Sequence, residues 1–197
     1  MKIKLIIISL MFILGISTYA QQTSVQQLFQ TQLQEKNADI ISINCRFKQT
    51  RQVSYLANPA VKEGDFSFTK PNDILLAFDD GDYIKMTSEY FEMKTAGNVA
   101  KTKVNANPML KNLSSILSTC VLGNFENMSA GFDVDIKQSE TEWVATLTPK
   151  QSKVAAKISS IIISFDKSDM SLNLLKMVEK SGDYTAYTFT NKHETRK

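Results

Sequence analysis

The chain has 197 residues, of which 43% are hydrophobic and 22% are charged, which is typical of one globular domain rather than of a disordered chain. Its net charge of +3 is too small for a nucleic-acid-binding surface. One His and two distant Cys are too few for a zinc finger, an iron–sulfur cluster or a histidine metal cage. Catalytic classes that depend on histidine are therefore disfavoured, and we expect no metal and no cofactor.

The first residues have the pattern of a secretory signal. A short basic start precedes an apolar run over residues 5–16, and Thr18 and Ala20 offer small side chains at the expected cleavage positions. The run of about 12 residues is too short to cross a hydrocarbon core as a helix. We therefore predict a signal peptide over residues 1–20 and a single domain over residues 21–197. The alternative, an N-terminal membrane anchor, is disfavoured by the polar residues that follow directly.

The predicted domain begins with an amphipathic helix and continues as short strands. Val25, Leu28, Phe29 and Leu33 recur at helical spacing, which predicts a helix over residues 24–36. Alternation of apolar and polar residues, interrupted by Gly, Asn, Asp and Pro, then predicts strands joined by tight turns. The predicted strands are residues 41–49, 64–69, 74–78, 83–87, 90–94, 99–104, 132–138, 143–148, 158–166, 172–179 and 184–190, with residues 53–56 as an additional short strand.

A second helix interrupts the strands. Pro108 suits a first helical turn and Gly123 a C-terminus, which predicts a helix over residues 108–122. Its apolar stripe includes Leu110, Leu113, Ile116, Leu117 and Cys120. A stripe of this length must pack against another apolar surface. For Cys45 and Cys120 two alternatives stay open: a disulfide, which the oxidising compartment reached after export permits, or two small buried hydrophobic side chains.

These elements predict a mainly β fold of the α+β type. Short strands joined by tight turns must pair antiparallel, since parallel pairing needs long crossovers. A sheet of about ten or eleven strands does not stay flat, so we predict an unclosed, strongly curved barrel or half-barrel. One face of it needs an apolar cover, and the two helices are the predicted lid. The polar tail over residues 193–197 is predicted to fray.

The sequence lacks the usual marks of a catalytic site. It has no Gly-x-Ser-x-Gly, no Gly-rich phosphate loop, no His-Glu-x-x-His and no Cys-x-x-Cys. His193 lies in the polar tail, and the acidic segment 79–82 fits a hairpin turn better than a calcium loop. The acidic residues between 133 and 142 fit the solvent face of a hairpin, with a paired-carboxylate glycosidase as a minor alternative. We therefore expect that the protein is not an enzyme.

Large apolar side chains alternate along successive predicted strands. Core packing explains any one of them, but as a set, with the stripe of the second helix, they predict a hydrophobic ligand cavity. The predicted lipid-binding residues are Phe47, Phe66, Phe68, Ile74, Leu76, Phe78, Ile84, Met86, Phe91, Met93, Leu110, Leu113, Ile116, Leu117, Trp143, Ile163 and Phe165.

Several segments together resemble the family of the periplasmic lipoprotein carrier LolA. They are Phe47-Lys48-Gln49-Thr50, Glu63-Gly64-Asp65-Phe66-Ser67-Phe68, Thr69-Lys70-Pro71-Asn72 and Trp143-Val144-Ala145-Thr146-Leu147-Thr148-Pro149-Lys150. The resemblance implies an unclosed barrel with a helical lid over an apolar cavity. It also implies a monomeric periplasmic carrier that takes lipoproteins from an inner-membrane ABC lipoprotein-release transporter, covers their acyl chains and passes them to an outer-membrane receptor.

The resemblance also implies a lid latch. The family has a basic residue, typically Arg, directly before Pro71, and it tethers the closed lid; here that residue is Lys70, which lacks the planar fork of Arg. Ile74 and Leu76 are aliphatic where the family commonly has aromatic residues. Other functions stay open: binding of a free lipid or a pigment precursor, or a surface module that binds no ligand. A lipid hydrolase is disfavoured by the missing nucleophile and base.

Overall fold

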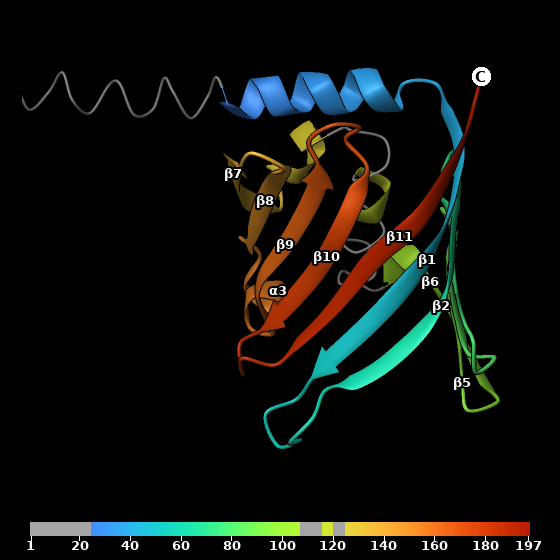
Figure 1. Cartoon of the computed structure of the whole chain (residues 1–197). Coiled ribbons are helices and arrows are strands. Elements are labelled where there is room, and N and C mark those ends of the chain that lie inside the picture. Colours follow the sequence, from blue (N-terminus) through green and yellow to red (C-terminus); the bar gives the residue numbers. More distant parts are fainter. Residues whose placement is uncertain (1–24, 107–115, 120–124) are drawn as a thin grey trace, which may run out of the picture.

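The described residues form one open antiparallel sheet of eleven strands, in the order β6-β5-β4-β3-β2-β1-β11-β10-β9-β8-β7 (Figure 1). The computed structural model describes residues 25–106, 116–119 and 125–197. Strands β6 and β7 are the two edges, so the sheet does not close on itself. The strands are β1 (Ile40–Gln52), β2 (Ala60–Thr69), β3 (Asp73–Phe78), β4 (Tyr83–Met86), β5 (Tyr90–Thr95), β6 (Asn98–Lys103), β7 (Phe132–Gln138), β8 (Glu142–Pro149), β9 (Ile158–Asp166), β10 (Leu172–Glu179) and β11 (Tyr184–Arg196). The predicted antiparallel, unclosed architecture is confirmed.

Two meanders are joined at the centre of the sheet, where the first strand pairs with the last. Strands β1 and β11 are each 13 residues long and pair from Ile40 opposite Arg196 to Gln52 opposite Tyr184. The prediction that residues 193–197 fray is therefore wrong. Although polar, this segment satisfies its backbone groups in the ladder with β1, which sequence polarity alone does not reveal.

The predicted short strand over residues 53–56 is also wrong. Strand β1 continues to Gln52, and the chain then turns, with the Leu56 N–H donating to the Val53 carbonyl at 2.9 Å. The Ser54 N–H donates to the Asp183 side chain at 2.8 Å, which ties this loop to the β10–β11 turn. Val53 is buried although it lies in a loop, so its apolar side chain is explained by burial and not by a strand.

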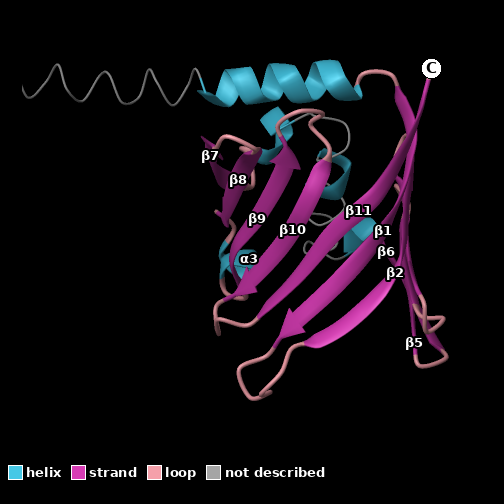
Figure 2. Ribbon diagram, viewed as in Figure 1, coloured by secondary structure: helices cyan, strands magenta, loops and turns pink. Residues whose placement is uncertain are grey.

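An N-terminal helix over residues 25–37 lies across one end of the curved sheet (Figures 1 and 2). It is close to the predicted range, and Phe29 and Leu33 are fully buried one helical turn apart. Leu28 does not belong to this face as predicted: its side chain is 47% exposed. The buried stripe is therefore narrower than the sequence pattern indicated.

Short helical segments occur elsewhere in the chain. The structure has 3-10 helices η1 (Val104–Ala106) and η2 (Phe125–Met128), and helix α3 (Ser152–Ala155) where the sequence predicted only a turn. Of the predicted helix over residues 108–122, only residues 116–119 are described, and they are helical. Leu110, Leu113 and Cys120 lie outside the described residues.

Gly64 permits a close approach between β2 and β3. A Cβ atom at this position would lie 2.1 Å from the carbonyl oxygen of Ala77 and 2.8 Å from the Cα of Phe78, its partner in the ladder. A side chain there would force the two strands apart, because real Cβ contacts are never that short. The absence of a side chain at Gly64 therefore allows β2 and β3 to pair closely, in the half of the sheet that contains most of the predicted site residues.

Candidate functional site

The ladder register brings the predicted apolar residues onto one face of the sheet. Cross-strand partners share a face, and one continuous row runs Cys45, Phe66, Leu76, Ile84, Met93 from β1 to β5. The neighbouring row runs Ile43, Phe68, Ile74, Met86, Phe91. On the other side of the centre, the rows are Trp143, Phe165, Leu172 and Ala145, Ile163, Leu175, Tyr187. Residues predicted from alternation therefore form one surface.

Most of these side chains belong to one buried cluster. The predicted residues that are buried there are Phe47, Phe66, Phe68, Ile74, Leu76, Phe78, Met86, Ile116, Leu117, Trp143, Ile163 and Phe165. Ile84 and Phe91 pack against the cluster and stay partly exposed, whereas Met93 is 37% exposed near the edge of the sheet. Strand β6, beyond Met93, has no buried residue. The apolar face therefore continues from a covered centre to an uncovered edge.

A small apolar cavity lies between the two halves of this face. Its volume is about 30 Å³, and the predicted residues Phe66, Leu76, Ile84, Met86 and Leu117 line one part of its wall. The rest of the wall is Leu175, Met177, Tyr187 and Phe189. Leu175 and Met177 belong to the alternating apolar residues that predict a cavity, although not to the predicted lipid-binding residues, whereas Tyr187 and Phe189 are additional residues that continue the alternation of β11. A space of this size holds about two water molecules, so an acyl chain enters only if side chains move.

One margin of this cavity is polar. The Gln49 side chain donates a hydrogen bond of 2.7 Å to the Tyr187 hydroxyl, across the β1–β11 ladder. Burial raises the pKa of the Tyr187 hydroxyl. Cys45, on the same face, is a buried thiol that forms no disulfide within the described part of the chain. Burial raises its pKa to about 11, so the thiol is protonated and unreactive at neutral pH. Its predicted alternative partner, Cys120, lies outside the described residues.

Aromatic contacts fasten the N-terminal helix to the sheet. The Phe29 ring lies 5.5 Å from the Trp143 ring and 5.4 Å from the Phe165 ring, and it meets Phe125 edge-on at 5.2 Å. Distances and tilts of this kind are favourable for aromatic pairs. The Trp143 indole N–H is buried and has no hydrogen-bond partner in the described part of the chain. Phe29 was predicted to lie on the helix stripe, but its partners could not be deduced from periodicity.

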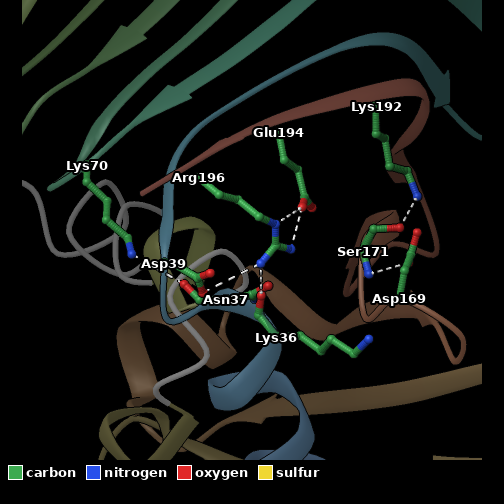
Figure 3. Close-up of polar contacts among 9 residues, drawn as sticks. All are labelled: Lys36, Asn37, Asp39, Lys70, Asp169, Ser171, Lys192, Glu194 and Arg196. Carbon is green, nitrogen blue, oxygen red and sulfur yellow. Dashed lines mark hydrogen bonds and ion pairs between the residues drawn. The ribbon is translucent and has the colours of Figure 1, made fainter.

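Two cations meet the C-terminal end of this helix (Figure 3). The Lys70 ammonium donates to the carbonyl oxygens of Asn37 and Ala38 at 3.3 and 3.1 Å. The Arg196 guanidinium donates to the carbonyl of Lys36 at 2.7 Å. Cations favour the negative end of a helix and satisfy its unpaired carbonyls. The described contacts of the predicted latch residue Lys70 are thus with the N-terminal helix, and Arg196 is a second anchor that the frayed-tail prediction missed.

Asp80, Asp82 and Asp133, which were considered as catalytic or metal-binding candidates, take part in surface ion pairs. Lys62 bridges Asp80 and Asp82 at 2.8 Å each, and hydrogen bonding to Lys62 lowers the pKa of both carboxyl groups. Asp133 pairs with Lys150 at 3.1 Å and is largely exposed. Among the described residues, no group of three or more His, Cys, Asp and Glu side chains is placed to hold a metal ion.

A family model described as "Outer membrane lipoprotein carrier protein LolA" matches residues 38–197. The chain belongs to the LolA family. Residues 38–197 contain every described strand, so the family match and the eleven-stranded sheet cover the same part of the chain. No curated protein matches the sequence. None of the helices in the described residues combines the length and the apolar character needed to cross a membrane.

Solved structures with a similar fold have very different sequences. A putative outer membrane lipoprotein-sorting protein domain from Vibrio parahaemolyticus has 9% identity over 89% of this chain and 93% of that one, with a TM-score of 0.46. The lipoprotein LppX from Mycobacterium tuberculosis has 13% identity over 85% and 94%, with a TM-score of 0.42. A LolA superfamily protein from Nitrosomonas europaea has 10% identity over 84% and 92%, with a TM-score of 0.38.

Proposed function

We propose that this LolA-family protein is a periplasmic carrier that shields the acyl chains of lipoproteins and shuttles them from the inner to the outer membrane. In this proposal residues 1–20 direct export and residues 21–197 form the mature domain. The observation that carries the proposal is the continuous apolar face of an open sheet, covered in part by the helix over residues 25–37 and by residues 116–119. The family membership supports the same function.

The proposed binding surface is the face that begins at the central cavity and continues toward the open edge. It comprises the predicted residues of strands β1–β5, β8 and β9, and we add Leu175, Met177, Tyr187 and Phe189 because they complete the cavity wall. Leu110 and Leu113 remain proposed lid residues outside the described part. The chemistry needed is burial alone, and no nucleophile or base is required.

Binding and release depend on two opposing free energies: the gain from burying an acyl chain and the cost of separating the side chains that pack around the cavity. Burying about ten methylenes yields roughly 8 kcal/mol, which corresponds to near-micromolar affinity. The closed protein has about 30 Å³ in its apolar cavity, so opening must separate packed side chains and offsets part of this gain. Reversible loading from an ABC transporter and unloading to a receptor need such an intermediate affinity. In this proposal Lys70 opposes opening by holding the end of the N-terminal helix.

Native mass spectrometry of protein purified without detergent tests the proposal. We expect a bound mass equal to that of a lipid or lipoprotein, and displacement of a fluorescent fatty acid by a triacylated lipopeptide. A free lipid or a pigment precursor as the only bound species would assign a different ligand to the same face. Failure to take up any apolar probe would leave a surface module and contradict the carrier function. Cleavage of the lipopeptide during incubation would instead indicate a hydrolase.

Polar substitution of a cavity residue tests the site. Leu117→Asn places an amide in the apolar cavity wall, and we expect it to weaken loading of the lipopeptide at least tenfold, because the amide must lose water when the chain binds. Leu56→Asn is the matched control, since Leu56 is 42% exposed in the β1–β2 loop. Thermal unfolding establishes that both variants are folded. Equal loading by Leu117→Asn, Leu56→Asn and the unsubstituted protein would remove residues 116–119 from the mechanism.

A further inference from the structure

A second cavity lies beside the apolar one and has a different character. Its volume is also about 30 Å³, and polar groups of Asn37, Ser171, Lys192 and Glu194 contribute to its lining. Asn37 is buried although polar, and it ends the helix over residues 25–37. None of these four residues was predicted as a site residue. Most of the other lining is apolar, but Lys192 and Glu194 give this cavity charged side chains, which the lining of the first cavity lacks.

A β-bulge brings Lys192 to this cavity. Asn44 pairs with His193 and Arg46 with Thr190, so Cys45 alone faces both Asn191 and Lys192. Without the extra residue, alternation from Tyr187 and Phe189 would put position 191 on the apolar face. Asn191 instead adopts a left-handed backbone with φ of 53°, a conformation that Asn tolerates better than most residues. Bulges commonly redirect a side chain in this way beside functional sites.

The opposite wall of the cavity has a second unusual backbone position. Met170 is buried and has φ of 58°, which is an outlier for a bulky side chain. The next residue, Ser171, accepts a hydrogen bond of 2.8 Å from the Lys192 ammonium through its hydroxyl oxygen (Figure 3). Strained positions of this kind persist where the surrounding structure holds them, and they cluster at ligand sites. Each of the two left-handed positions, Met170 and Asn191, thus directly precedes a residue of this hydrogen-bonded pair.

The Lys192 ammonium is suited to binding a ligand oxygen. Its described partners are Ser171 Oγ and Asn173 Oδ1, which use two of its three N–H bonds. Burial lowers its pKa, since the half-buried charge has lost part of its hydration. The carboxylates of Asp166, Asp169 and Glu194 act in the opposite direction and favour the charged form. A charged donor with one free N–H beside an apolar cavity forms a strong hydrogen bond to an oxygen acceptor.

Two aromatic rings separate this polar cavity from the apolar one. Phe66 and Phe189 line both cavities, and their rings meet edge-on with centroids 5.3 Å apart. An acyl chain that parts these rings would occupy the apolar cavity and bring its head end next to Lys192. We propose that the second cavity, lined in part by Asn37, Ser171 and Lys192, is a polar subsite. In this subsite Lys192 binds the carbonyl or carboxylate oxygen at the head end of a bound acyl chain. This inference rests on the proposed function, because it assumes that the apolar face takes acyl chains.

The test compares a fluorescent fatty acid, cis-parinaric acid, with its methyl ester, which has the same chain and no charge. We expect the unsubstituted protein to bind the acid about tenfold more tightly, because both groups are charged in the bond to a carboxylate, whereas only the ammonium is charged in the bond to the ester carbonyl. Lys192→Met should abolish this preference by weakening binding of the acid about tenfold more than binding of the ester. Lys192→Arg should retain the preference. Lys176→Met is the matched control, since Lys176 neighbours the cavity residue Leu175 but lies on the other face, over the Tyr184 ring.

The outcomes separate the subsite from the carrier function. Equal affinity for acid and ester in the unsubstituted protein, or an unchanged preference in Lys192→Met, would overturn the subsite while lipid binding stands. Equal weakening of both probes by Lys192→Met would mean that Lys192 only maintains the structure, which also overturns it. No binding of either probe would overturn the carrier function itself. Displacement by a triacylated lipopeptide distinguishes the oxygen source. If Lys192→Met weakens binding of the lipopeptide more than binding of the methyl ester, the source is its ester or amide carbonyls; if it does not, the source is a free carboxylate.

Discussion

Replacing Phe29 with alanine should detach or loosen the N-terminal helix. Phe29 is fully buried, and its ring lies within 5.5 Å, centroid to centroid, of three other aromatic rings. Losing such a side chain costs about 3–5 kcal/mol, of which each well-oriented aromatic pair contributes about 0.5–1.5 kcal/mol beyond area burial. Leu28→Ala is the matched control on the same helix. Since Leu28 is 47% exposed, we expect its substitution to change stability by no more than about 0.5 kcal/mol.

Trp143 reports on this contact directly, because it is the only tryptophan in the sequence and its ring touches Phe29. Urea unfolding followed by far-ultraviolet circular dichroism and by tryptophan fluorescence measures the free energy of unfolding of each variant. For Phe29→Ala we expect a lower midpoint and a red-shifted native emission spectrum, as water reaches the indole. A loss below about 1 kcal/mol with an unchanged emission spectrum would refute the view that Phe29 docks the helix on the sheet.

Other substitutions address separate features of the fold and site. Gly64→Ala should prevent expression of folded protein or lower the free energy of unfolding by at least about 3 kcal/mol, because its Cβ would clash with the backbone of β3. At the control position Gly131 a Cβ would meet open space, so Gly131→Ala should leave the thermal unfolding midpoint nearly unchanged. Arg196→Ala should speed amide hydrogen exchange at the end of the N-terminal helix and cost no more than about 1 kcal/mol, since the guanidinium is partly exposed. Because the pKa of the Cys45 thiol is raised in the folded protein, its contribution to the free energy of unfolding is complete below about pH 9 and is lost as the pH rises through about 11. After treatment with iodoacetamide at pH 8, peptide mapping should find Cys45 unlabelled in the folded protein and labelled in urea. Phe189→Ala should lower stability by about 3–5 kcal/mol yet raise the affinity for cis-parinaric acid in a fluorescence titration, because it joins the two cavities into a preformed space.

Strands with strict alternation between clear turns could be predicted to the residue. The ranges 132–138, 158–166 and 172–179 agree with β7, β9 and β10. Failures occurred where local pattern and tertiary context disagree. Residues 193–196 are polar but pair with β1, and residues 53–56 are partly apolar but turn. In both cases the decisive partner is far away in sequence, so a local pattern carries no information on it.

Part of the candidate site could likewise be predicted from the local sequence pattern, and part could not. Alternation identified the apolar face because a register with one buried side fixes every second residue. It could not identify Lys192, since counting by two from Phe189 leads to position 191, and only the bulge opposite Cys45 brings residue 192 to the cavity. The left-handed backbone of Asn191 is the physical cause. An Asn before the polar end of a strand is the only trace of the bulge in the sequence, and it is too common to be diagnostic.

Under the proposed carrier function, the small size of both cavities affects how cargo is bound reversibly. Each cavity has a volume of about 30 Å³, and Phe66 and Phe189, whose rings meet edge-on, line both. Protein side chains therefore occupy most of the space that a bound acyl chain would need. Exposing about 200 Å² of apolar surface on opening would cost about 5 kcal/mol, against roughly 8 kcal/mol from burying ten methylenes. The difference, and not the burial alone, sets the affinity. A wider preformed cavity would hold a lipid more firmly and release it more slowly, so close packing of the side chains around both cavities would favour delivery.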